Sequence, residues 1–186
     1  MTLSQFDRDL RLPLVDLPPG NGASIYREIS TVVPADLGTE VAHVPDGTAL
    51  LFDVTLTAIS GGVLARLGGH VSATAQCVRC LDEIDISFVL NADQLFYYQD
   101  KRDELVAEGD EEAQYVPIIA GTELDLSDMV RDGIVTALPY APLCDPDCLG
   151  LCSECGLSLN ENPEHSHQVI DPRWAVLAKL KESDNG

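Results

Sequence analysis

Six cysteines and two neighbouring histidines occur at spacings that suit metal binding. Thiolates separated by two or three residues can bind one tetrahedral ion from a tight turn, and a glycine after the second cysteine, such as Gly156, eases that turn. Eight ligands in four pairs suit two zinc ions, or one ion with spectator residues. The four pairs are Cys77 with Cys80, Cys144 with Cys148, Cys152 with Cys155, and His165 with His167.

Two assignments of these pairs to ions remain open. In the first, the last two pairs form a local unit whose short loop is cheap to close, and the first two pairs form a long-range site that fastens the C-terminal segment to a sheet. In the second, the four cysteines between residues 144 and 155 surround one ion, which requires consecutive pairs only three residues apart to wrap it.

Thiol redox chemistry at Cys77 and Cys80 is the rival interpretation, since Arg79 would stabilise a thiolate. The surrounding pattern is strand, turn and strand, however, and not the strand and helix of a thioredoxin-like motif. A catalytic zinc needs an open coordination position and a nearby general base, and no H-E-x-x-H motif is present. The spacing therefore favours structural zinc, with no catalytic residue.

The charge is strongly negative, because 11 basic residues face 31 acidic ones and give a formal net charge of −20 at pH 7. Such an acidic protein repels phosphates, so direct nonspecific binding of nucleic acid is not expected. The complementary partner is a basic protein or a metal. The densest acidic run is 100–112, with seven acids against two bases and no apolar periodicity. This composition predicts a solvated, mobile loop.

The elements that would position the cysteines are mostly strands. Alternating apolar residues predict strands over 48–59 and 84–98, with a strand between them that is broken at Gly68-Gly69, and a shorter strand over 115–119. Residues 10–17 suit an edge strand and 26–33 fit a strand or a helix. Ser127 is expected to cap a helix over 127–138, and a second helix is expected over 171–180. The predicted fold is α+β, with an antiparallel β-rich meander or barrel-like sheet, two helices and a zinc-binding C-terminal segment.

The expected organisation is a β-rich domain over 1–143 with a cysteine- and histidine-rich segment and helix over 144–186 packed on it. The N-terminal residues lack the basic and apolar regions of a secretion signal, and no apolar run reaches the length of a membrane span. The expected location is the cytoplasm, where thiols stay reduced and cysteines serve as metal ligands.

The order of these motifs resembles the YceD family. The resemblance is carried by the Cys77–Asp82 turn after a glycine-rich hairpin, an acidic insertion, Leu124-Asp125-Leu126-Ser127 before a helix ending in Ala137-Leu138-Pro139, and the tail 171–180. The segment 148–160 (CLGLCSECGLSLN) is similar to the Gram-positive, actinobacterial form, although that form often has Cys-x-Cys where this chain has His165-Ser-His167.

The resemblance implies a bacterial factor needed for accumulation of large-subunit ribosomal RNA, often encoded beside a small ribosomal protein, without established enzymatic activity. Some relatives keep the Cys77/Cys80 pair and lack the Cys152/Cys155 pair, which favours two separate zinc sites. The expected function is non-catalytic ribosome assembly through a basic ribosomal protein or a pre-ribosomal large subunit. A zinc-dependent or thiol redox enzyme and an acidic mimic of nucleic acid are the alternatives.

Overall fold

A computed structural model describes residues 4–34 and 37–167, and these form two compact units. The first unit comprises the chain up to Val78 together with Asp82–Cys144. The second comprises Arg79–Leu81 and the chain from Asp145 onward. All the strands and helices named below belong to the first unit.

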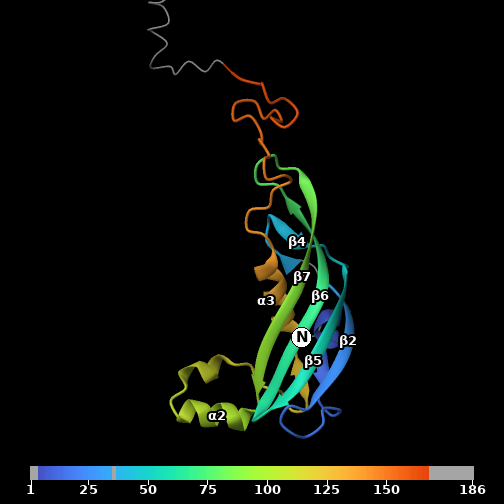
Figure 1. Cartoon of the computed structure of the whole chain (residues 1–186), viewed down its shortest axis with the longest axis vertical. Helices are drawn as coiled ribbons and strands as arrows, with labels where there is room; N and C mark the ends of the chain where they lie inside the picture. Colours follow the sequence, from blue (N-terminus) through green and yellow to red (C-terminus); the bar gives the residue numbers. More distant parts are fainter. Residues whose placement is uncertain (1–3, 35–36, 168–186) are drawn as a thin grey trace, which may run out of the picture. The chain divides into compact units, whose positions relative to one another are not determined.

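The first unit is built on a curled, open antiparallel sheet (Figure 1). The strand order is β2-β5-β6-β4-β3, and β7 lies on the other side of β6. This half-barrel confirms the expected β-rich, antiparallel fold. The strands are β2 (Ser24–Val32), β3 (Leu37–Gly38), β4 (Ala42–Val44), β5 (Ala49–Ile59), β6 (Gly62–Gln76) and β7 (Glu83–Tyr97).

Alternation of apolar side chains fixes the face that each long strand buries. In β5, Leu50, Phe52, Val54 and Leu56 are buried, whereas the residues between them are exposed or half-buried. The expected strands over 48–59 and 84–98 are therefore confirmed as β5 and β7. The ambiguous stretch 26–33 is resolved as a strand, β2, because it pairs with β5 over all nine of its residues.

The glycine pair in β6 does not break that strand, contrary to the expectation. β6 runs through Gly68 and Gly69 and pairs with β7 along its whole length. A Cβ on Gly69 would lie 2.5 Å from Cδ1 of Phe52 and 2.6 Å from the carbonyl oxygen of Leu51. Because Gly69 has no side chain, the buried ring of Phe52 packs directly against the backbone of β6. The glycine is therefore explained by packing and not by a turn.

A second layer packs on the sheet through the same hydrophobic core. It contains the two-stranded pair of β1 (Arg11–Pro13) and β8 (Glu123–Asp125), with the helices α1 (Gln5–Asp9) and α3 (Ser127–Ala137). Phe6 of α1 and Ile134 of α3 are buried in the core that includes the β5 side chains. Arg131 of α3 joins the two helices, since it bonds Asp7 at 3.0 Å and lies over the Phe6 ring.

α3 confirms the expected helix, but its start differs. Ser127 is the first helical residue and is buried, whereas the Asp125 carboxylate accepts the Ser127 N–H at 3.0 Å. The cap is thus supplied by the aspartate two residues upstream. The second expected helix, over 171–180, lies outside the described residues.

The acidic run 100–112 is not a loop, and this expectation was wrong. It forms helix α2 (Gln99–Ala107) and leads into the short 3-10 helix η1 (Glu111–Tyr115). None of the side chains of α2 is buried, so its sequence carries no apolar periodicity, but it has helix-favouring residues and a Lys101–Glu104 ion pair of 2.8 Å. The strand expected over 115–119 is also absent, apart from a single bridge between Tyr97 and Ile118.

Candidate metal centres

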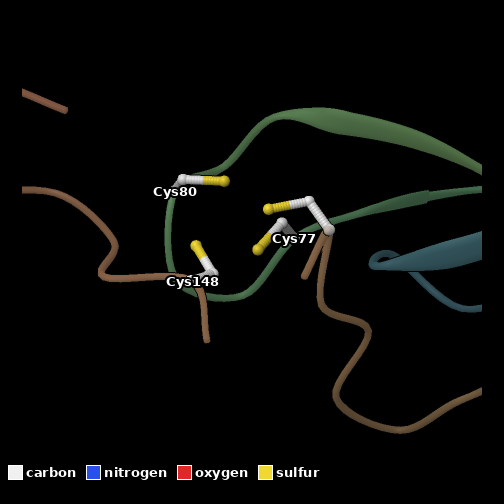
Figure 2. Close-up of side chains that lie close together, drawn as sticks. Cys77, Cys80 and Cys148 are labelled. Carbon is white, nitrogen blue, oxygen red and sulfur yellow. The ribbon is translucent and has the colours of Figure 1, made fainter. Parts of the chain in front are cut away.

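The first candidate centre contains four cysteines. The Sγ atoms of Cys77, Cys80, Cys144 and Cys148 all lie within 4.8 Å of one another. Figure 2 shows the thiols of Cys77, Cys80 and Cys148 directed toward one another. Three of the four residues are buried and Cys144 is exposed. Sulfur atoms around a tetrahedral zinc ion lie about 3.8 Å apart, so this set could hold one such ion.

The Cys77–Asp82 turn presents the first pair. The N–H of Cys77 donates to the carbonyl oxygen of Asp82 at 2.8 Å, which closes the turn. Leu81 has φ +65°, the only positive φ of a non-glycine residue among those described. This left-handed residue lets the chain reverse immediately after Cys80 and enter β7.

A second turn presents Cys148. The N–H of Cys148 donates to the Asp145 carbonyl oxygen at 3.0 Å, and the Asp145 carboxylate accepts the Asp147 N–H at 2.8 Å. Arg79 supports this turn from outside, because its guanidinium donates to the Cys148 carbonyl oxygen at 2.8 Å. Arg79 thus holds this turn by donating hydrogen bonds to the turn's carbonyl oxygens. This role differs from the thiolate stabilisation expected for a redox pair.

Two residues that the spacing did not single out complete the surroundings of Cys148. The amide of Asn160 donates to Cys148 Sγ at 3.2 Å, and its oxygen accepts the Leu149 N–H at 2.7 Å. Gly150 has φ +78°, and a Cβ there would lie 2.9 Å from the Arg79 carbonyl oxygen. The glycine allows close approach of the segment that contains Arg79, whose carbonyl accepts the Leu151 N–H. Nothing in the sequence signalled the Asn160 contact, because 12 residues separate Asn160 from Cys148.

The second candidate centre contains two cysteines and two histidines. The ligand atoms of Cys152, Cys155, His165 and His167 lie within 4.8 Å of one another. Nε2 of His165 and Nε2 of His167 lie 3.2 and 3.1 Å from Cys155 Sγ and 2.8 Å from each other. Tetrahedral zinc sites place such atoms about 3.3–3.6 Å apart, so a slight opening of this set accommodates an ion.

The turn that carries Cys152 and Cys155 is closed in the same way as the first. The N–H of Cys152 donates to the Leu157 carbonyl oxygen at 2.8 Å, and Gly156 has φ +72°. The pKa of the Cys152 thiol is lowered, chiefly because the backbone N–H of Glu154 points at its sulfur and, next, that of Cys155. Both N–H groups favour the thiolate, which is the form that binds a metal.

The structure thus brings the eight candidate ligands together in two separate sets. Cys144 and Cys148 lie with Cys77 and Cys80, and Cys152 and Cys155 lie with the histidines. No disulfide links the six cysteines, all of which are among the described residues. Both sets could hold a four-coordinate ion, and they differ in burial, since the second set is half-buried or exposed.

Comparisons with known proteins identify one family and several relatives of this chain. The family described as "Large ribosomal RNA subunit accumulation protein YceD" matches residues 67–181. Uncharacterised proteins of Mycobacterium tuberculosis and Mycobacterium bovis are each 34% identical over 153 residues, which cover 81% of this chain and 72% of theirs. An uncharacterised protein of Mycobacterium leprae is 33% identical over 183 residues, covering 95% of this chain and 82% of its own.

No solved structure matches this chain. Within residues 4–34 and 37–167, no helix is long and apolar enough to cross a membrane. The family match includes all eight candidate ligands as well as β7, α2 and α3. The chain therefore belongs to the YceD family of large ribosomal RNA subunit accumulation proteins.

Proposed function

We propose that this protein is a non-catalytic assembly factor of the large ribosomal subunit that acts in the cytoplasm and supports accumulation of large-subunit ribosomal RNA. The observation that carries this proposal is the YceD match over residues 67–181, whose description names that accumulation. The candidate metal sets add a physical argument. Each has four protein ligands, which leaves no coordination position for a substrate on a four-coordinate ion.

The charge indicates how the factor reaches ribosomal RNA. With a net charge of −20, the protein is repelled by phosphates and attracted to basic proteins. Ribosomal proteins that neutralise RNA are basic, so such a protein, free or on a pre-ribosomal particle, is the proposed partner. Electrostatic attraction would speed the encounter without requiring contact between this chain and the RNA.

Helix α2 is the proposed point of first contact. All its side chains are at least partly exposed, and the stretch 100–112 holds seven acids. Three side-chain interactions maintain the helix: the Lys101–Glu104 pair, the 2.7 Å bond from Gln99 to Asp103 and the 3.4 Å bond from Arg102 to Gln99. Asp100 and Glu108 take part in none of these hydrogen bonds, so their charges are available to a partner.

The proposed ions are zinc, one in each set. Four thiolates, or two thiolates with two imidazoles, are ligand sets typical of structural zinc. Bound zinc would stabilise the turns that carry the ligands, because the free energy of metal binding contributes directly to folding.

The function is tested by deleting the gene in its own organism and measuring the ratio of large- to small-subunit ribosomal RNA. The ratio should fall on deletion and return when the wild-type gene is restored. An Asp100→Lys/Glu108→Lys variant should restore it incompletely and retrieve less pre-ribosomal material. A Glu28→Lys/Glu123→Lys variant, which makes the same change of charge on β2 and β8, should behave as wild type. An unchanged ratio on deletion contradicts the proposed function, and equal behaviour of the two variants contradicts the role of α2.

A further inference from the structure

β7 is an edge strand of the half-barrel along nearly all of its length. Its residues pair with β6 from Tyr97↔Gly62 to Glu83↔Gln76 in one continuous register, without a bulge. On the other side of β7, within residues 4–34 and 37–167, the only strand-type pairing is at Tyr97, which bridges to Ile118. Among the described residues, a long row of backbone groups on β7 therefore has no strand partner.

The bridge at Tyr97 shows which backbone groups point outward. The Tyr97 N–H donates to the Pro117 carbonyl oxygen at 3.0 Å, and the Tyr97 carbonyl accepts the Ile119 N–H at 2.9 Å. Both groups of Tyr97 thus face away from β6. Because these groups alternate in direction along a strand without a bulge, every second residue presents its N–H and C=O at the open edge. These residues are Glu83, Asp85, Ser87, Val89, Asn91, Asp93 and Leu95.

The edge lacks several of the features that usually prevent strand addition. β7 contains no proline, lysine or bulge, each of which can protect an edge strand, and its charged side chains are all acidic. Val89, near its middle, is 55% exposed. The other face of β7 is covered in part by α3, where Gly133 packs against Leu90 and Ala92. In the part of the chain that the structure describes, the edge is used once, since the segment around Ile118 adds to it at Tyr97.

The charges on this edge are acidic. Glu83 and Asp85 are exposed and have no ion pair in the described part of the chain, whereas Asp93 pairs with Arg66 at 2.9 Å. A second copy of this chain, added through its own β7, would place acidic side chains opposite acidic ones, which destabilises a pair of strands. A basic segment would place lysine or arginine there instead.

We propose that the open edge of β7 is a strand-addition site for an extended, basic segment of a partner protein. This inference rests on the proposed function, because it assigns the basic partner a place on the sheet. Backbone hydrogen bonds to the outward residues supply affinity, and the acidic side chains select a basic segment. α2 begins at Gln99, directly after β7, so its acids extend the negative charge beyond the end of the edge.

The test uses a synthetic peptide of alternating valine and lysine, and residue-resolved amide exchange of the full protein loaded with zinc. In the free protein, the outward amides of Ser87, Val89 and Asn91 should exchange fast, and the alternate amides of Phe88 and Leu90, bonded to β6, should exchange slowly. The peptide should protect the outward amides. The same peptide with every second nitrogen methylated keeps its charge and should not protect them. Protection of the outward amides already in the free protein, or none with the peptide, overturns the proposal.

Variants separate backbone pairing from charge. Val89→Pro removes one outward N–H at a position where an edge strand tolerates proline. It should weaken peptide binding about tenfold. Val89→Ala keeps the N–H and should bind the peptide as the wild type does. Glu83→Lys/Asp85→Lys should also weaken binding, unlike Glu28→Lys/Glu123→Lys. Far-ultraviolet circular dichroism confirms folding of each variant. Wild-type affinity in folded Val89→Pro overturns strand addition.

The ribosomal RNA ratio on gene deletion separates the two proposals. A fall on deletion together with no protection of β7 rejects the edge and retains the assembly role. Protection of β7 with an unchanged ratio rejects the assembly role and retains a strand-addition site for a basic peptide.

Discussion

The turns Cys77–Asp82 and Cys152–Leu157 have the same backbone but different surroundings. In each, the N–H of the first cysteine bonds the carbonyl five residues ahead, and the residue after the second cysteine has positive φ. Cys77 and Cys80 are 0% and 4% exposed, whereas Cys155 is exposed. The same backbone turn thus occurs at two places in the chain. In the first its thiols are shielded from water, and in the second they are not.

The shielding should decide how firmly each set holds its ion. Water, protons and chelators reach a thiolate only through an exposed path, and the first set has three buried cysteines. The second set is drawn from residues close in sequence, so its ligands remain near one another even without a metal. We therefore expect the four-cysteine set to matter for folding and the cysteine–histidine set to exchange its zinc.

The largest expected effect comes from breaking the buried set. Cys80→Ser should lower the free energy of unfolding by about 4 kcal/mol or more, because a structural ion is lost and a buried polar group replaces a ligand. Cys155→Ser is the matched control and should change the sheet's melting temperature little. Circular dichroism of the β signal during heating measures both. Equal melting temperatures in Cys80→Ser and wild type would contradict a structural role for the buried set.

Metal content should follow the same division. Elemental analysis of the untagged protein should give two zinc ions per chain, and one in the Cys152→Ser/Cys155→Ser variant. In the wild type, a chelator should remove one ion quickly and the second slowly. A fall from one ion to none in the double variant would instead support a single site formed by the cysteines between 144 and 155.

Gly150→Ala tests the packing of Arg79 against the second turn. The added Cβ would lie 2.9 Å from the Arg79 carbonyl oxygen at a φ of +78°, so strain and a steric clash should together cost about 2 kcal/mol. Gly156→Ala has a similar φ but nothing within 4 Å of its Cβ, and should cost about 1 kcal/mol. Denaturant titration of the zinc-loaded proteins compares the two. A larger loss in Gly156→Ala would contradict this view of the turn.

The sheet was predictable because burial imposes a period of two on β5 and β7. Features that bury no side chain, or that depend on contacts between segments distant in sequence, were not predictable in this way. The acidic run forms α2 without any buried side chain, so hydrophobic periodicity could not reveal it. The expected elements did not include α1, although Ser4 and Asp7 form a capping box that signals a helix start. Spacing identified the ligand pairs, but their grouping depends on which segments the fold brings together.

Asn160→Ala should weaken zinc binding without unfolding the sheet. Its amide donates to Cys148 Sγ, and loss of a hydrogen bond to a ligand typically costs about tenfold in metal affinity. Asn162→Ala is the matched control, because the Asn162 amide donates to the Ser158 carbonyl and not to a thiol. Competition with a coloured chelator measures the affinity of the tighter site. Equal affinities in the two variants would remove Asn160 from the surroundings of the metal.

The smallest effect, Leu81→Gly, concerns the residue that distinguishes the two turns. A non-glycine residue in the left-handed region costs about 1–2 kcal/mol, whereas glycine enters it freely but loses about 0.5–1 kcal/mol more chain entropy on folding. Leu81 is 55% exposed, so little burial is lost on truncation. The substitution should therefore stabilise the protein by up to about 1 kcal/mol, and Gly156→Leu should destabilise it. Destabilisation by Leu81→Gly would mean that the leucine side chain contributes more to the buried turn than its exposure suggests, and the two turns would then differ in packing as well as in access to water.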